Sequence, residues 1–137
     1  MLRRVSHLGL AVRDLDAAIR LYEGVFGLQV THRWTAEADG MQAAALHVGD
    51  LEIELMQPIR QDSPVARFIE RRGEGLHHVA YKVDDVAEAL EKVEEFGVET
   101  VDREPRTGGD GRTRIAFLHP RGTFGVLMEL EEDVREA

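Results

Sequence analysis

The chain carries an internal repeat, and this repeat limits the possible folds more than any other feature of the sequence. The segment HLGLAVRDLDAAIRLYEGVFGLQV, which begins at His7, aligns with HVAYKVDDVAEALEKVEEFGVETV, which begins at His78. At an offset of 71 positions (78 − 7), Asp14 meets Asp85. We therefore expect two copies of one supersecondary unit.

Each copy shows the same order of local patterns. A strand-like run, at 5–12 in the first copy and 78–83 in the second, precedes an aspartate suited to cap a helix. An amphipathic helix follows, and it ends near a glycine, Gly27 or Gly97, that suits a left-handed C-terminal position. The expected apolar faces comprise Leu15, Ala18, Ile19, Tyr22 and Phe26 in the first helix and Val86, Ala89, Leu90, Val93 and Phe96 in the second.

The rest of each copy is predicted to form three strands, which turn signals such as Asp39-Gly40 separate. The linker between the copies is predicted to be a helix, with Ser63 as its cap and Gly73 as its stop. The predicted strands are 28–35, 41–48 and 51–57, followed by 98–103, 113–118 and 125–130.

These elements predict an α+β fold in which tandem βαβββ modules form a curled mixed sheet around a cavity. We expect a single domain over residues 1–137. Within it, module one covers about 1–60, the linker helix about 62–73 and module two about 74–133.

Composition narrows the class of function. The formal net charge of −9 argues against nucleic-acid binding, because nothing offsets phosphate repulsion across the molecule. Apolar runs are too short for a membrane helix, and the N-terminal pattern does not predict a signal peptide. The absence of cysteine excludes disulfides and thiol catalysis, and it favours a cytoplasmic location.

Each copy places a histidine in its first strand and a glutamate inside an apolar last strand. The pairs are His7 with Glu54 and His78 with Glu129, at separations of 47 (54 − 7) and 51 (129 − 78). Alternation along the last strands puts both glutamates on the side opposite to the residues that pack against the helix. We therefore expect Glu54 and Glu129 to line the cavity.

Two imidazoles and two carboxylates suit a divalent ion that accepts nitrogen and oxygen ligands, such as Co²⁺, Mn²⁺, Ni²⁺ or Zn²⁺. Taken singly, each residue is more typical of a core histidine or a solvent-facing glutamate. Their recurrence at matched positions favours a metal site held by His7, Glu54, His78 and Glu129.

The other histidines have weaker claims to the site. His77 is a neighbour of His78 on the same strand, so the two side chains point to opposite faces and only one can be a ligand. The repeat selects His78 and leaves His77 to pack or hydrogen-bond on the other face. His32, His47 and His119 have no counterpart in the other copy, and we expect surface or turn roles for them.

Around these residues the sequence resembles the vicinal oxygen chelate superfamily, which includes glyoxalase I, extradiol dioxygenases, fosfomycin resistance proteins and methylmalonyl-CoA epimerases. It looks most like the epimerases, over nearly the whole chain. The DSP linker helix and the GEGLHH segment are the most specific features. The matching segments are HLGLAVRDLDAAIRLYEGVFGL, IELMQPIRQDSPVARFIERRGEGLHHVAYKVDDV and IAFLHPRGTFGVLMELEE.

This resemblance implies an isomerase that interconverts (2R)- and (2S)-methylmalonyl-CoA through a metal-stabilised enolate. It implies the same four metal positions, cobalt as the expected ion, and Glu129 as a catalytic residue in proton transfer. A homodimer is expected, because open sheets and an apolar linker helix leave surfaces to be covered. The alternatives are a glyoxalase I-like lyase acting on a glutathione hemithioacetal and a metal-free drug-binding resistance protein of the same fold.

The sequence departs from the epimerase pattern at the second proton-transfer group. Some epimerases carry a further acidic residue after the equivalent of Gly40, where this chain has Met41-Gln42-Ala43-Ala44-Ala45. Glu37 or Asp39, another group or a water would have to serve, or the activity differs. Phe124 also stands in a turn where a small residue is commoner in the family.

A CoA thioester would also need cations for its phosphates. Individually, each arginine is more typical of a solvated face than of a phosphate site. The arginines cluster as Arg60, Arg67, Arg71 and Arg72 around the linker helix and as Arg103, Arg106, Arg112, Arg114 and Arg121 in the later loops.

Overall fold

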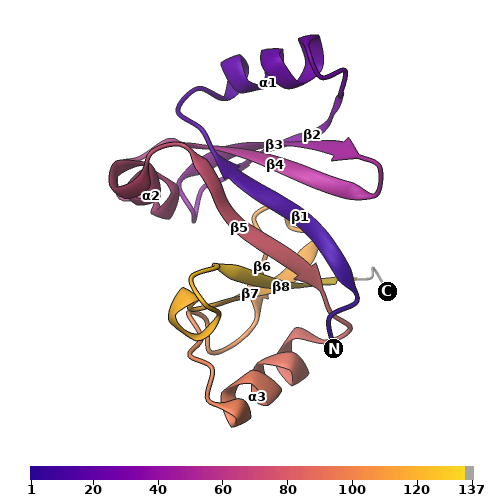
Figure 1. Cartoon of the computed structure of the whole chain (residues 1–137), viewed down its shortest axis with the longest axis vertical. Helices are drawn as coiled ribbons and strands as arrows, with labels where there is room; N and C mark the ends of the chain where they lie inside the picture. Colours follow the sequence, from indigo (N-terminus) through magenta and orange to yellow (C-terminus); the bar gives the residue numbers. More distant parts are fainter. Residues whose placement is uncertain (135–137) are drawn as a thin grey trace. The chain divides into compact units, whose positions relative to one another are not determined.

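The computed structural model describes residues 1–134, so the last three residues of the expected 1–137 domain lie outside the described residues. The chain divides into two compact units. The N-terminal unit comprises His7–His77, and the C-terminal unit comprises Met1–Ser6 together with the chain from His78 onward. Figure 1 labels the elements of both units.

The N-terminal unit has the predicted βαβββ order, followed by the predicted linker helix. Its strands lie in the order β2-β3-β4-β1, with β1 parallel to β4 and the other neighbours antiparallel. The elements are β1 (Arg4–Ala11), α1 (Leu15–Gly24), β2 (Val30–Ala36), β3 (Met41–Val48), β4 (Leu51–Pro58) and α2 (Pro64–Arg72).

The C-terminal unit repeats the order βαβββ. Its strands lie in the order β5-β8-β7-β6, again with the first and last strands of the module, β5 and β8, parallel. The elements are β5 (Gly75–Lys82), α3 (Val86–Phe96), β6 (Arg106–Thr107), β7 (Thr113–Leu118), the 3₁₀ helix η1 (Pro120–Gly122) and β8 (Met128–Asp133).

Helix α1 covers one face of the N-terminal sheet (Figure 1). The carboxylate of Asp14 accepts a hydrogen bond from the Ala17 amide at 3.0 Å, which confirms the predicted N-cap. Leu15 and Ile19 are buried against the sheet. Their partners in this core cluster include Ala44, Leu46 and Leu55.

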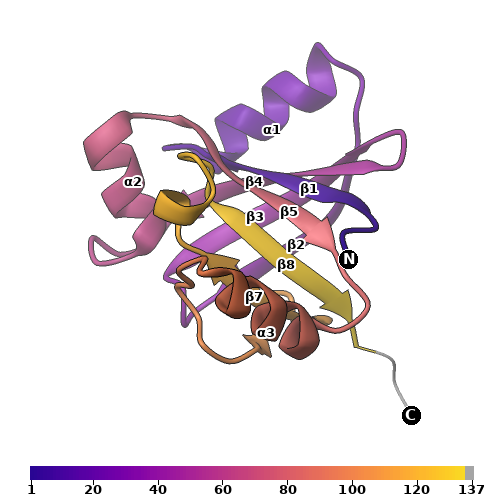
Figure 2. The same cartoon turned by 60° about the horizontal axis from the view of Figure 1, so that its bottom comes forward.

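Helix α3 covers β7 and β8 of the C-terminal sheet in the equivalent way (Figure 2). The Asp85 carboxylate accepts from the Glu88 amide at 3.1 Å. Gly97 ends the helix with a left-handed φ of 96°, as the repeat predicts. Val86 and Leu90 pack with Leu130, so the helix-covered face of β8 carries Leu130.

Helix α2 packs on the other face of the N-terminal sheet. The fully buried Ser63 caps it, because its hydroxyl accepts from the Val65 amide at 3.1 Å. Val65 and Ile69 join a core cluster with Met56 and Ala11. This helix therefore covers part of the face that α1 leaves open.

The predicted strand over 98–103 is wrong. Within this stretch Thr100 forms only an isolated bridge with Leu118, and the short strand β6 comes later. The Val98 amide is bonded to the end of α3, and the Asp102 carboxylate accepts from the Phe117 amide at 2.8 Å. The Asp102 side chain thus bonds the Phe117 amide of β7, which would otherwise donate to the backbone of a longer neighbouring strand.

The last strand begins three residues later than the predicted 125–130. Phe124 and Gly125 have positive φ angles of 58° and 91°, so the chain is still turning at 125. Strand β8 then continues to Asp133, which pairs with Thr113.

The predicted helix faces are also too long at their C-terminal ends. Phe26 and Phe96 are 57% and 89% exposed, although the Phe26 ring lies edge-on to Tyr22. Helix α1 ends at Gly24, so Phe26 lies outside it. Phe96 is the last residue of α3, next to the Gly97 cap, so it lies past the buried residues Val86, Ala89 and Leu90 at the end of the helix.

Candidate metal site

The N-terminal unit brings His7 and Glu54 together. They lie on the parallel neighbours β1 and β4, where Glu54 is opposite Gly9, two residues after His7. His7 and Gly9 share a face of β1, so the histidine and the glutamate face the same side of the sheet. His7 Nε2 and Glu54 Oε2 are 3.3 Å apart, and the two residues are 2% and 9% exposed.

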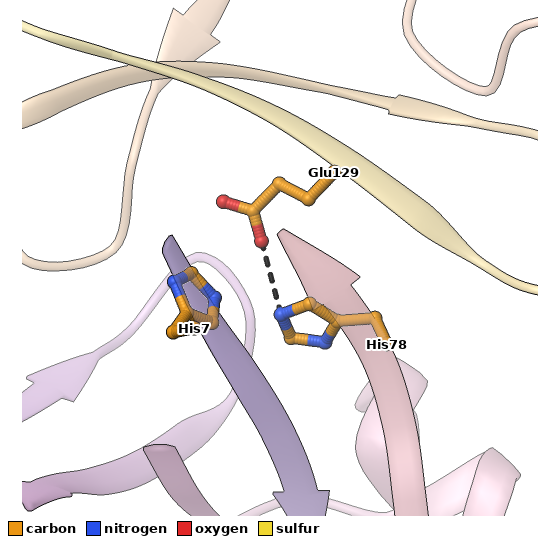
Figure 3. A group of neighbouring side chains, drawn as sticks. All are labelled: His7, His78 and Glu129. Atoms are coloured by element: carbon orange, nitrogen blue, oxygen red, sulfur yellow. Dashed lines mark ion pairs between the residues drawn. The ribbon is translucent and has the colours of Figure 1, made fainter. Parts of the chain in front are cut away.

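The C-terminal unit brings His78 and Glu129 together in the same way. Glu129 on β8 is opposite Ala80, two residues after His78 on the parallel strand β5. His78 Nε2 and Glu129 Oε1 are 3.0 Å apart, and both residues are buried (Figure 3). The ring of Phe117 lies edge-on to the imidazole, with centroids 5.4 Å apart.

The two pairs are therefore equivalent in register as well as in residue type. In both units the glutamate faces away from the side of its strand that α1 or α3 covers, because Leu55 and Leu130 next to the glutamates belong to the clusters packed under those helices. This confirms the predicted direction of Glu54 and Glu129. The shared register also explains the similar separations of 47 (54 − 7) and 51 (129 − 78) residues.

The donor atoms of these pairs suit a divalent ion. Burying a carboxylate is costly unless a cation or hydrogen bonds compensate its charge. An imidazole nitrogen within about 3 Å of a carboxylate oxygen offers the mixed nitrogen and oxygen donors that Co²⁺, Mn²⁺, Ni²⁺ and Zn²⁺ accept. The residues present thus fit a divalent metal.

Glu52 is a further candidate donor that sequence reasoning missed. His7, Glu52 and Glu54 offer ligand atoms that all lie within 4.8 Å of one another. Glu52 is two residues before Glu54 and opposite His7, so it faces the same side of the sheet. Strand alternation could have found it, but the repeat could not, because Leu127 stands at the corresponding distance before Glu129.

His77 packs away from the His78–Glu129 pair. Its ring lies edge-on to Phe68, with centroids 4.9 Å apart, in agreement with the predicted packing on the other face. His119 has the predicted turn role, since its Nδ1 accepts from the Arg121 amide at 3.0 Å. His47 is exposed on strand β3, in agreement with the expected surface role, whereas His32 is half-buried within strand β2.

Some arginines have partners within the chain and others do not. Arg60 donates to the Asp62 carboxylate and to the Glu37 carbonyl, and most arginines of the later loops pair with acidic residues. Three arginines on α2 are exposed and have no side-chain ion pair within residues 1–134, namely Arg67, Arg71 and Arg72. Ion pairs in the later group join Arg106 to Asp102, Arg114 to Glu132 and Arg121 to Glu99.

Across residues 1–134, helices fall short of the length and apolarity needed to cross a lipid bilayer.

The fold and the paired residues define a member of a known superfamily. The family model described as the Glyoxalase/Bleomycin resistance protein/Dioxygenase superfamily matches residues 6–117, and the chain belongs to this superfamily. An uncharacterized protein of Bacillus subtilis, YqjC, is 40% identical over 131 residues, which cover 96% of this chain and 93% of the relative.

Epimerases are among the relatives and the structural neighbours. The ethylmalonyl-CoA/methylmalonyl-CoA epimerase of Cereibacter sphaeroides is 33% identical over 134 residues, which cover 96% of this chain and 99% of the epimerase. The solved structure of a methylmalonyl-CoA epimerase in complex with methylmalonyl-CoA and NH4+ matches with a TM-score of 0.92 and 36% identity. That match covers 98% of this chain and 96% of the other, and it confirms the predicted fold class.

Proposed function

We propose that the protein is a metal-dependent methylmalonyl-CoA epimerase. The observation that carries this proposal is the pair of buried His–Glu contacts, placed at the same register in the two units. Support for the substrate comes from relatives and neighbours that are named as epimerases of this CoA thioester.

In this proposal one divalent ion binds to His7, Glu54, His78 and Glu129. Three of these buried side chains, drawn in Figure 3, would supply two imidazole nitrogens and a carboxylate oxygen. Cobalt is the expected metal.

The chemistry requires removal of a weakly acidic proton. When bound, the ion supplies Lewis-acid stabilisation of the negative charge that develops on the thioester oxygen. Glu129 accepts the proton from C2 of one epimer, which leaves a planar carbon. Return of a proton to the opposite face gives the other epimer. The buried position of Glu129 keeps bulk water from competing for this proton.

The exposed arginines of α2 are proposed to attract the CoA phosphates. Arg67, Arg71 and Arg72 point into solvent from one short helix and keep their charge free for an anion. The homodimer and the cytoplasmic location remain predictions.

Metal binding is tested by comparing His78→Ala with His77→Ala. Loss of a residue that only supports a metal ligand lowers metal affinity by up to about 100-fold. Loss of the imidazole ligand itself should therefore lower the affinity for Co²⁺ by at least about 100-fold. The His77→Ala variant should keep the metal, because His77 packs against Phe68. Metal content after dialysis is the measurement, and equal losses in both variants would refute the assignment of His78.

Catalysis is tested with Glu129→Gln. The amide keeps an oxygen for the metal but cannot accept a proton, so the Co²⁺-loaded variant should lose about 10²–10⁴-fold in turnover. The measurement is deuterium entry at C2 of each methylmalonyl-CoA epimer in D₂O, with wild type alongside. A metal-loaded wild type that exchanges neither epimer would disprove the epimerase proposal, and the glutathione hemithioacetal would then be assayed.

A further inference from the structure

We infer that His32 is the second proton-transfer group of the site, a role that rests on the proposed epimerase function. Epimerisation needs one group to take a proton from C2 and another to return a proton to the opposite face. Glu129 fills the first role in the proposal above. The second group has to be titratable and to face the side of a sheet that carries the metal ligands.

His32 lies in one row with Glu54 across the N-terminal sheet. On the antiparallel strands β2 and β3, His32 is opposite Ala45, and on β3 and β4, Ala45 is opposite Glu54. Residues paired in this way project from the same face of a sheet. His32 therefore faces the same side as Glu54 and His7.

The row leaves space between the two side chains. Two strand spacings put the Cα atoms of His32 and Glu54 about 10 Å apart. The only side chain between them in the row is the methyl group of Ala45. Such a gap suits a small acyl group better than direct contact between the histidine and the glutamate.

The imidazole of His32 is held in place by an aromatic neighbour. It stacks on the indole of Trp34, with centroids 5.0 Å apart and planes 17° apart. Trp34 in turn packs against the apolar cluster under α2, opposite the small residue Ala43. The stack fixes the plane of the ring and leaves its nitrogens at the edge, where they can exchange protons.

Among the histidines on this face of the N-terminal sheet, His32 is the one that does not contact a carboxylate. His7 contacts Glu54, and His47 contacts Glu52 at 3.4 Å. The ring nitrogens of His32 form no hydrogen bond or ion pair with any residue of the described chain, 1–134. Strand β3 adds no acid to this face, because its residues there are Met41, Ala43, Ala45 and His47.

The proton balance is complete with these two groups. In one direction the C2–H bond breaks and its proton goes to the Glu129 carboxylate, while the His32 imidazolium gives its proton to the other face and a new C2–H bond forms. In the reverse direction neutral His32 accepts and protonated Glu129 donates. Both groups then regain their starting states by exchange with solvent, and nothing is oxidised or reduced.

The test is His32→Gln, followed with each epimer separately in D₂O. A single remaining base can still exchange the C2 proton of the epimer that it faces, with retention of configuration. The variant should therefore label one epimer at a rate within a few fold of wild type. Labelling of the other epimer and interconversion of the two should both fall by about 10²–10⁴-fold.

Arg33→Gln is the matched control, because it changes an exposed side chain on the opposite face of the same strand and should behave as wild type. Wild-type interconversion by His32→Gln would overturn the inference. Equal loss of both exchanges together with loss of Co²⁺ would also overturn it, because His32 would then be structural. Failure of wild type itself to exchange either epimer would instead point to failure of the underlying epimerase proposal.

Discussion

Phe124 combines two unfavourable features at one position. Its φ of 58° is the only positive value at a non-glycine residue in the described chain, 1–134, and its side chain is fully exposed. The turn around it is firmly held, since the Gly125 amide donates to the Pro120 carbonyl at 2.8 Å and the Thr123 hydroxyl donates to the Val126 carbonyl at 2.6 Å. The strain is therefore imposed by the turn and cannot relax locally.

Replacement of this residue by glycine should stabilise the protein. A left-handed conformation costs about 1–2 kcal/mol for a residue with a side chain, whereas glycine loses about 0.5–1 kcal/mol through its greater freedom when unfolded. Phe124→Gly should thus gain up to about 1.5 kcal/mol, or up to about 5 °C in Tm. Phe96→Ala removes another exposed phenylalanine without relieving strain, and its Tm should stay near that of wild type. A lower Tm for Phe124→Gly in calorimetry would contradict the strain.

Single residues were predictable where two independent patterns agreed. His7, Glu54, His78 and Glu129 satisfy both the repeat and the alternation of the strands, and each unit brings its pair together. Strand alternation places His32 on the same face as these residues, but the repeat offers no counterpart for it. Its role was missed because β2 has seven residues while its counterpart β6 has two, so the second unit offers no matching position.

At the scale of elements, helices were predicted better than strand limits. Each helix carries its own cap in the sequence, such as Asp14 or Ser63, and these caps are observed. Strands depend on partners that are distant in sequence. The limits of β6 and β8 are set by a side-chain acceptor, Asp102, and by the turn at Phe124, and neither effect appears in a hydrophobic pattern.

The parallel pairing of β5 with β8 contains an ion pair that the first unit lacks. Lys82 lies opposite Glu131 and contacts both Glu131 and Asp133, and the Ser6 hydroxyl also donates to Glu131. At the equivalent positions the N-terminal unit has an apolar pair, namely Ala11 and Met56. Burial disfavours the charged form of Lys82, but the hydrogen bonds to Asp133 and Glu131 outweigh it and raise the pKa of Lys82.

This ion pair predicts both a mutational and a pH effect. Lys82→Met leaves the buried Glu131 carboxylate without its cation and should cost roughly 3 kcal/mol. The double variant Lys82→Met with Glu131→Gln should recover most of that loss, because the amide is neutral and still accepts from Ser6. Urea unfolding of the two variants is the measurement. Equal stability of Lys82→Met and wild type would show that the pair contributes nothing.

The pH effect follows from the direction of the Lys82 shift. Because its pKa is raised on folding, the stabilisation is fully present below the ordinary value of 10.5 and is lost as the pH rises through the folded-state value. Wild type should therefore lose more stability above this pH than the double variant, in which position 82 carries no titratable group.

At the scale of the whole molecule, two strands connect the compact units. The boundary between the units falls between Ser6 and His7 within β1, and between His77 and His78 within β5. Each boundary thus cuts through a β-strand and not through an exposed linker, where domain boundaries usually fall. This double connection supports the prediction of one domain over the chain.

One domain should unfold in one cooperative step. Leu55→Ala and Leu130→Ala each remove a fully buried side chain, the first from the N-terminal unit and the second from the C-terminal unit. Each should cost about 2–5 kcal/mol. In scanning calorimetry each variant should shift a single peak, with equal calorimetric and van't Hoff enthalpies. Two peaks, with only one moved by each variant, would show that the units are separate domains.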